Sequence, residues 1–282
     1  MKPLNAALIL EGGGLRGNYT AGVLDAFLDR GISFPYIVGV SAGVGYGCSY
    51  VSNQPGRNLE ILKKYRNDPR YLSYRSLFTT GNLFGLDFIY DEIPTRLIPL
   101  DYDCFSKNPC RFVAVCTDCK TGEAIYCDKG NEYTMQEYMT ILKGSSALPY
   151  VSRIVNFRGM KLLDGAITDA IPLKKAQAEN YPHNVVVLTQ PAGFRKKEEP
   201  HPPPTLFYKK YPKLIAALGQ RVNNYNKTIE YVEEEEEQGH CLVIRPSVDL
   251  KVGRTEKSVE KLVCLYELGI SDGRKAINAI SR

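Results

Sequence analysis

The sequence predicts an α/β fold with a doubly wound, mainly parallel central sheet. Two stretches near the start of the chain, residues 6–30 and 36–52, each run from an apolar strand through a glycine-containing turn into a helix. Two β-to-helix units in succession are typical of a parallel sheet. Two apolar runs, Val185–Thr189 and Cys241–Arg245, predict further buried strands. The 282 residues and 44% hydrophobic content suit one large domain over residues 1–282.

The first unit contains a strand over Ala6–Leu10, a glycine loop over Gly12–Gly17 and a helix over Tyr19–Leu28. Backbone N–H groups at such a helix start have no partner within the helix and are able to bind an anion. The loop is a weak match to a nucleotide-binding motif because it lacks the Lys-Ser/Thr ending of a P-loop. A dinucleotide-binding fold would also place an acidic residue where Ser41 stands.

The second unit contains a G-x-S-x-G motif, Gly39 to Gly43, between a strand over Ile37–Val40 and a helix from Ala42 to about Ser52. A sharp strand-to-helix turn exposes the central serine, and the flanking glycines let the neighbouring backbones pass closely. The motif therefore makes Ser41 a candidate nucleophile. Small residues also surround serines in ordinary turns, so the two neighbouring glycine turns together support this interpretation more than either alone.

The middle of the chain contains recognisable elements separated by a less regular segment. Residues 70–109 show no clean period, and we expect short helices and loops near the site there. The elements predicted around this segment are a helix over Asn58–Tyr65, strands over Arg111–Thr117 and Glu123–Cys127, a helix over 135–142 capped by Thr134, and a strand at Lys161–Leu163 that ends at Asp164.

The residues after about 190 differ from the motif-bearing core over about 1–190. Phe194–Pro204 is polar and rich in proline, which predicts a linker that cannot bury itself. The rest of residues 191–282 is predicted to form a mobile helical segment over Leu206–Leu218, a helix over Val222–Val232 with a solvated end at Glu233–Glu237, the strand at Cys241–Arg245 and a closing helix over Val259–Ile280.

Composition limits the class of protein and its partners. The net charge of +5 and the pI of about 8.6 are compatible with an anionic lipid surface but fall short of a nucleic-acid-binding signature. The apolar start is too short for a signal peptide, and no apolar run is long enough to cross a bilayer. We therefore expect a cytoplasmic protein whose membrane contact, if any, is peripheral. The sequence carries no indication of oligomeric state.

The eight cysteines are scattered through apolar segments, which fits reduced thiols better than a disulfide framework. Cys116 and Cys119 form the one closely spaced pair. Without a second pair or a histidine at ligand spacing, strand-end packing is a better explanation for them than zinc. We expect no metal and no cofactor.

A nucleophilic serine needs a base, and the three histidines are poor candidates. His183 and His240 lie next to the amino ends of predicted strands, opposite the crevice expected at the carboxyl ends. His201 lies in the proline-rich linker, where we expect no fixed orientation. Asp164 follows a strand and precedes a glycine that allows close approach, so it is a candidate base. A turn or helix-capping role is the alternative for Asp164.

Four motifs in order resemble those of the patatin-like phospholipase family, in its bacterial single-domain form. They are Gly12–Gly17, Gly39–Gly43, Ser145–Pro149 and Asp164–Ala166, and they cover roughly the first two thirds of the chain. The resemblance implies a three-layer α/β/α fold. It also implies hydrolysis of fatty acyl esters of lipids or phospholipids by a Ser–Asp dyad, without a catalytic histidine.

The resemblance assigns roles residue by residue. Ser41 would be the nucleophile that forms an acyl-enzyme, Asp164 the base, and Gly39 and Gly43 the flanks of the nucleophile turn. The oxyanion hole would come from the glycine-rich loop, whose residues are Gly12, Gly13, Gly14, Leu15, Arg16 and Gly17.

Two other functions remain open from the sequence. One is a non-catalytic lipid- or protein-binding scaffold of the same fold, and the other is a Ser–His–Asp esterase that uses His183 or His240. A separate hypothesis concerns access to the site. Aromatic residues over 71–90, together with the basic and aromatic segment 206–211, would line an acyl groove and touch an anionic membrane surface.

Overall fold

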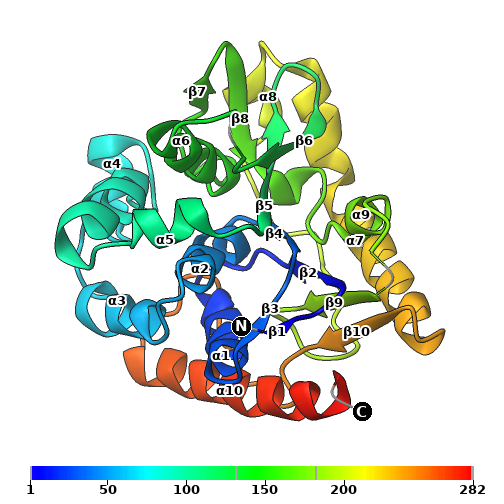
Figure 1. Ribbon diagram of the computed structural model, residues 1–282. Helices are drawn as coiled ribbons and strands as arrows, with labels where there is room; N and C mark the ends of the chain where they lie inside the picture. Colours follow the sequence, from blue (N-terminus) through cyan, green and yellow to red (C-terminus); the bar gives the residue numbers. More distant parts are fainter. Residues whose placement is uncertain (1, 131, 182, 281–282) are drawn as a thin grey trace.

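The computed structural model describes residues 2–130, 132–181 and 183–280, which form a mixed central sheet flanked by helices (Figure 1). The strand order is β10-β9-β2-β4-β5-β8-β7, with β6 paired to β5. The pairs from β10 to β5 are parallel, whereas β6, β7 and β8 pair antiparallel. The strands are β2 (Ala6–Leu10), β4 (Tyr36–Val40), β5 (Arg111–Asp118), β6 (Glu123–Asp128), β7 (Val155–Phe157), β8 (Met160–Asp164), β9 (His183–Val187) and β10 (Cys241–Ile244).

Helices cover both faces of this sheet, so the fold has the three α/β/α layers that the sequence predicts (Figure 1). Alternate residues of β2 divide between the layers: Leu8 packs with one set of helices and Ile9 with the other. One layer contains α1 (Asn18–Asp29), α2 (Ala42–Val51), α6 (Met135–Ser145) and α10 (Val259–Ile280). The other contains α7 (Leu173–Gln177) and α9 (Pro212–Glu237).

Short helices fill the segment between α2 and β5. α3 (Arg57–Tyr65) is the helix predicted over Asn58–Tyr65. The irregular segment 70–109 contains α4 (Tyr74–Thr80), the π-helix η2 (Phe88–Leu97) and α5 (Tyr102–Lys107), in line with the short helices expected there. The remaining elements are a small β1–β3 sheet (Lys2–Pro3 and Ile32–Ser33), the 3₁₀ turns η1 (Gly14–Gly17) and η3 (Gly165–Ile167), and α8 (Pro204–Tyr208).

The long strand β5 determines how two other strands meet. β6 pairs with Val113 to Asp118 along one side of β5. On the other side, β4 pairs with residues 111–115 and β8 pairs antiparallel with residues 116–118. β4 and β8 therefore lie end to end along one side of β5, and their carboxyl ends face each other. Ser41 directly follows β4, and Asp164 is the last residue of β8.

Two expectations for the C-terminal part are wrong. The sequence predicts one helix over Leu206–Leu218 and another over Val222–Val232, but the break lies at residues 209–211. From Pro212 a single helix, α9, continues to Glu237. Proline suits the first turn of a helix, where its missing N–H is not needed. Gly219 stands at the expected break, but a glycine costs a helix interior only about 1 kcal/mol, and α9 continues through it.

The linker was also expected to stay unburied. Residues 197–203 are exposed as predicted, but the start of the linker packs against α9. The Phe194 ring meets the Tyr225 ring edge to face, with centroids 6.2 Å apart. The backbone of Lys196 exchanges two hydrogen bonds with the side chain of Asn226, at 2.8 and 3.0 Å. Composition failed here because one aromatic side chain and one asparagine on α9 are enough to fix the start of this polar segment.

Candidate active site

Ser41 occupies a strained turn between β4 and α2. Its backbone angles are φ 53° and ψ −123°, and its side chain is almost buried. A positive φ is unfavourable for a residue with a Cβ, so the surrounding structure must hold it there. The neighbouring backbones leave no room for side chains at the flanking glycines. A Cβ on Gly39 would lie 2.9 Å from the Val44 nitrogen, and one on Gly43 would lie 2.6 Å from the Leu10 oxygen.

Ser145 fixes this turn from the neighbouring helix α6. The Ser41 N–H donates to Ser145 Oγ at 2.9 Å, and the Ser145 hydroxyl donates to the Val115 carbonyl at 2.7 Å. The fully buried Ser145 therefore ties the turn to β5. The sequence places Ser145 in a motif but assigns it no role. Ser41, whose N–H the Ser145 oxygen accepts, lies 104 residues away in the chain, and no local pattern in the sequence reveals this contact.

The Asp164 carboxyl is buried at the end of β8, where Oδ1 accepts the Ala166 N–H at 2.8 Å. Its Oδ2 lacks a hydrogen bond of good geometry among the described residues. Burial raises the pKa of Asp164, and the nearby Ser41 hydroxyl and the Ala166 N–H oppose this shift. The sequence placed Asp164 correctly beside the serine, but β8 is antiparallel. Asp164 nevertheless lies beside Ser41, because β5 extends three residues beyond its pairing with β4 and β8 pairs with this extension.

The glycine loop lies next to Ser41, because β2 and β4 are parallel neighbours and Leu10 is paired with Gly39. Two of its amides are already occupied. The Leu15 N–H donates to the Arg254 carbonyl at 3.0 Å, and the Arg16 N–H donates to the Gly13 carbonyl at 3.3 Å.

The amides left for an oxyanion are those of Gly12, Gly13 and Gly14, while Gly17 directly precedes α1. The amide of Ala42, the first residue of α2, is a further donor. The first N–H groups of a helix have no intrahelical partner, and the residue after the nucleophile supplies an oxyanion donor in serine hydrolases with this turn.

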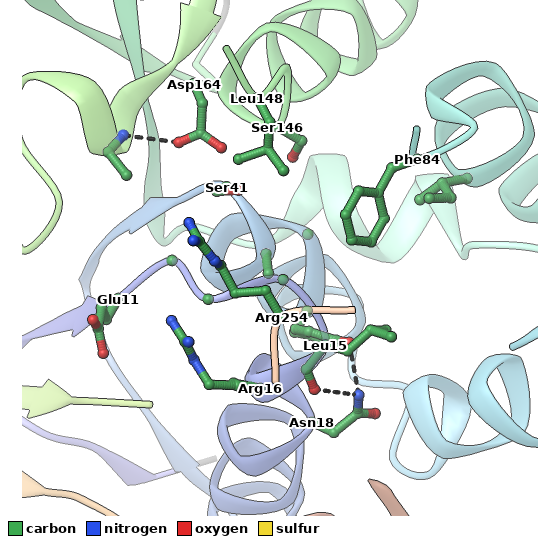
Figure 2. Close-up of a pocket in the computed structure, with 18 of the residues that line it drawn as sticks. Glu11, Leu15, Arg16, Asn18, Ser41, Phe84, Ser146, Leu148, Asp164 and Arg254 are labelled. Carbon is green, nitrogen blue, oxygen red and sulfur yellow. Dashed lines mark hydrogen bonds between the residues drawn. The ribbon is translucent and has the colours of Figure 1, made fainter. Parts of the chain in front are cut away.

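Ser41 and Asp164 line a cavity of about 550 Å³ with two unlike walls. One wall is apolar and comes mainly from the short helices between β4 and β5. Figure 2 shows Phe84 and Leu148 on this side, away from the arginines. The apolar lining includes Leu62, Tyr71, Phe84, Leu86, Ile89, Tyr90, Ile93, Met139 and Leu148. Five of these residues lie within 71–90, the segment in which the sequence predicts an acyl groove.

The other wall is basic. In Figure 2 the side chains of Arg16 and Arg254 extend below Ser41, and Lys196 and Arg221 line the same cavity. No role is predicted from the sequence for Lys196, Arg221 and Arg254, because they are scattered over a linker, a helix and a loop. Behind this wall Glu11 is buried and accepts three hydrogen bonds, from the Thr189 N–H, the Thr189 hydroxyl and the Tyr225 hydroxyl.

The histidines lie away from this cavity. His183 is the first residue of β9 and His240 directly precedes β10, so both stand at the amino edge as predicted. His201 was expected to have no fixed orientation, yet it stacks on the Tyr150 ring at 5.2 Å. None of the three appears among the described residues that line the cavity.

The surface around α4 and α8 exposes large aromatic and aliphatic side chains. Tyr74 and Phe78 on α4 are 72% and 86% exposed, and Leu206 and Phe207 on α8 are 74% and 50% exposed. Contact of these residues with a membrane stays a prediction. Across the described ranges, no helix combines the length and the apolar character needed to traverse a bilayer. All eight cysteines lie within those ranges and are free thiols.

Comparison with known proteins gives two family matches. The family model described as patatin-like phospholipase matches residues 8–176, and a domain of unknown function matches residues 211–282. A stretch of 197 residues is 30% identical to the uncharacterized protein YjjU of Escherichia coli (strain K12), covering 68% of this chain and 54% of YjjU. The chain thus spans about half the length of this relative. Among solved structures, VipD from Legionella pneumophila is similar with a TM-score of 0.47 and 12% identity, over 97% of this chain and 67% of VipD.

Proposed function

The chain belongs to the patatin-like phospholipase family, and from this premise we propose that it is a serine hydrolase that cleaves fatty acyl esters of lipids with Ser41 and Asp164. The observation that carries the proposal is the meeting of β4 and β8 along β5, where a strained serine and a buried carboxyl line a cavity with one apolar wall. Burial of this carboxyl makes it a stronger base than an exposed aspartate, because its pKa is raised.

Acylation of Ser41 begins when its hydroxyl attacks the ester carbonyl while Asp164 accepts the proton. The carbonyl oxygen becomes an oxyanion that accepts hydrogen bonds from the amides of Gly12–Gly14 and Ala42, each contributing about 3 kcal/mol. Collapse of the tetrahedral species breaks the ester C–O bond, and Asp164 returns the proton to the departing alcohol. Ser41 then carries the acyl group.

Hydrolysis of the acyl-enzyme repeats the same proton transfer with water. Asp164 accepts a proton as the water oxygen attacks the acyl carbonyl, and the same amides hold the oxyanion. The bond to Ser41 Oγ breaks, the proton returns to Oγ, and the fatty acid leaves. No histidine is required in either half of this cycle.

Ser41→Ala tests the nucleophile. We expect kcat/KM for a short nitrophenyl ester to fall by about a thousandfold or more, because removal of a nucleophile leaves only binding and oxyanion stabilisation. Labelling by a fluorophosphonate should disappear, and a lipid panel should release no fatty acid detectable by mass spectrometry. Undiminished turnover by this variant would reject the dyad.

Two matched controls separate this effect from general damage. Ser52 is another buried serine, at the end of α2 and outside the cavity lining, so Ser52→Ala should keep both activity and labelling. A triple variant of His183, His201 and His240 to glutamine should also remain active. Loss of activity in the folded triple variant would favour the Ser–His–Asp alternative. A folded wild-type protein that is neither labelled nor active on any lipid would favour a scaffold.

A further inference from the structure

The basic wall of the cavity is made largely by residues outside the segment that matches the phospholipase family. Arg16 comes from the glycine loop, but Lys196 lies in the linker, Arg221 on α9 and Arg254 in the loop before α10. Arg221 and Arg254 fall within residues 211–282, the match to a domain of unknown function. The C-terminal part therefore completes the cavity that contains Ser41.

These cations have few compensating partners. Arg254 pairs with Glu199, which is 69% exposed, whereas Arg16, Lys196 and Arg221 take part in no ion pair of the described residues. Arg16 Nε is buried without a hydrogen-bonding partner in the described part of the chain. Arg221 makes one long hydrogen bond, from Nε to the Ala166 carbonyl at 3.4 Å. Partly buried cations with so few partners are unfavourable unless an anion joins them.

The nearby carboxylates do not remove this imbalance. Glu11 is within electrostatic range of Arg16, but its carboxylate oxygens already accept three hydrogen bonds from uncharged donors. Burial is the main cause that lowers the pKa of Arg16 and of Arg221, in spite of Glu11 and Asp164 respectively. Burial, followed by Arg221 and Arg254, lowers the pKa of Lys196 to about 7. Each charge is thus held at a free-energy cost that a bound anion would offset.

We propose that Arg16, Lys196, Arg221 and Arg254 bind the phosphate group of an acidic lipid, so that lipids with a net negative headgroup are preferred over zwitterionic ones. Guanidinium groups suit phosphate because their planar donors form paired, charge-assisted hydrogen bonds with its oxygens. This inference rests on the proposed function in one respect: the lipid ester is taken to lie at Ser41, between the two walls.

The layout of the cavity favours a lipid headgroup over a small soluble anion. A glycerophospholipid carries an acyl chain, an ester and a phosphate in close succession, which matches the apolar wall, Ser41 and the basic wall. Arg221 donates to Ala166, two residues from Asp164, so the phosphate position adjoins the reacting ester. A choline group would find the face of Tyr225 already occupied by the Lys196 ammonium, 4.5 Å from the ring centre.

Binding to the full-length Ser41→Ala protein tests the proposal without turnover. The probes are dihexanoylphosphatidylglycerol, dihexanoylphosphatidylcholine and inorganic phosphate, each titrated as a monomer in a calorimeter. We expect the phosphatidylglycerol to bind about tenfold or more tightly than the phosphatidylcholine. Both lipids offer the same phosphate to the four cations, but phosphatidylcholine adds a positive charge that these cations repel. Combining Lys196→Gln with Arg221→Gln should weaken phosphatidylglycerol binding about tenfold to a hundredfold and abolish the preference.

Two controls accompany the paired variant: a lysine substitution outside the cavity and a measurement of stability. Lys227→Gln removes an exposed lysine from the same helix α9 and should leave the preference for phosphatidylglycerol intact. The paired variant should unfold at no lower temperature than its parent, because it loses two poorly compensated cations.

Equal affinity for the two lipids, or an unchanged preference in the folded paired variant, would overturn the proposal. Inorganic phosphate binding as tightly as phosphatidylglycerol would overturn the headgroup part of it. Because binding needs no chemistry, an inactive wild-type enzyme would refute the proposed function and leave this comparison valid.

Discussion

The two edges of the central sheet treat charge in opposite ways. At the amino edge, Arg111 donates to Asp128 at 2.7 Å and to Glu179 at 2.6 Å, and these partners raise the pKa of the guanidinium. At the carboxyl edge, burial lowers the pKa of Arg221 and raises that of Asp164. An arginine is therefore stabilised in its charged form at the amino edge, whereas an arginine and an aspartate are destabilised in their charged forms at the carboxyl edge.

This contrast shows where the fold gives up stability. The carboxyl edge combines buried charges with the strained backbone of Ser41, and such features persist only where the surrounding structure holds them. The amino edge follows the ordinary rules for ion pairs. Substitutions at the carboxyl edge should therefore lower activity and raise stability, and substitutions at the amino edge should lower stability alone.

Asp164→Asn should have the largest effect of these substitutions. Activity should fall by about a thousandfold, because the amide cannot accept the proton of Ser41. Stability near neutral pH should rise. A carboxyl whose pKa is raised on folding contributes stability only below its unfolded pKa, and loses that contribution as the pH rises through its folded pKa. The excess stability of the variant, followed by thermal unfolding, should shrink as the pH falls toward about 4.

Asp169→Asn is the matched control for this prediction. Asp169 follows Asp164 by five residues, its pKa is also raised by burial, and it accepts the Tyr126 hydroxyl at 2.7 Å. It does not belong to the described lining of the cavity, so its variant should keep its activity. An active Asp164→Asn protein, or one less stable than wild type near neutral pH, would contradict the proposed difference between the two edges of the sheet.

Ser41→Gly should have a smaller effect, seen in stability. Glycine adopts positive φ without strain, so Ser41→Gly should be more stable than Ser41→Ala by about 1 kcal/mol, although both are inactive. Ser52 provides the comparison because its φ of −85° is ordinary. There glycine should be less stable than alanine, since it loses more backbone entropy. Denaturant unfolding of the four variants measures both differences, and equal signs at the two positions would show that Ser41 is unstrained.

Much of this edge could be predicted from the sequence because its features are local. A glycine loop after one strand and a G-x-S-x-G turn after the next locate Ser41 and its candidate oxyanion donors. Asp164 could be placed only in part, since nothing in the sequence shows that β8 runs antiparallel. The basic wall could not be predicted at all. Lys196, Arg221 and Arg254 meet only through tertiary packing, and each alone resembles an ordinary surface charge.

Arg111→Met should have the smallest effect and tests the amino edge. The Arg111 side chain is 48% exposed and its guanidinium pairs with two carboxylates, so the loss of unfolding free energy should be about 1 kcal/mol or less in total. Salt screens such pairs, and the difference from wild type should shrink further at about 1 M salt. Ester hydrolysis should be unchanged, because Arg111 begins β5 at the edge opposite Ser41. If activity fell while the protein stayed folded, the edges would be coupled through β5, and the separation of stability from function between them would fail.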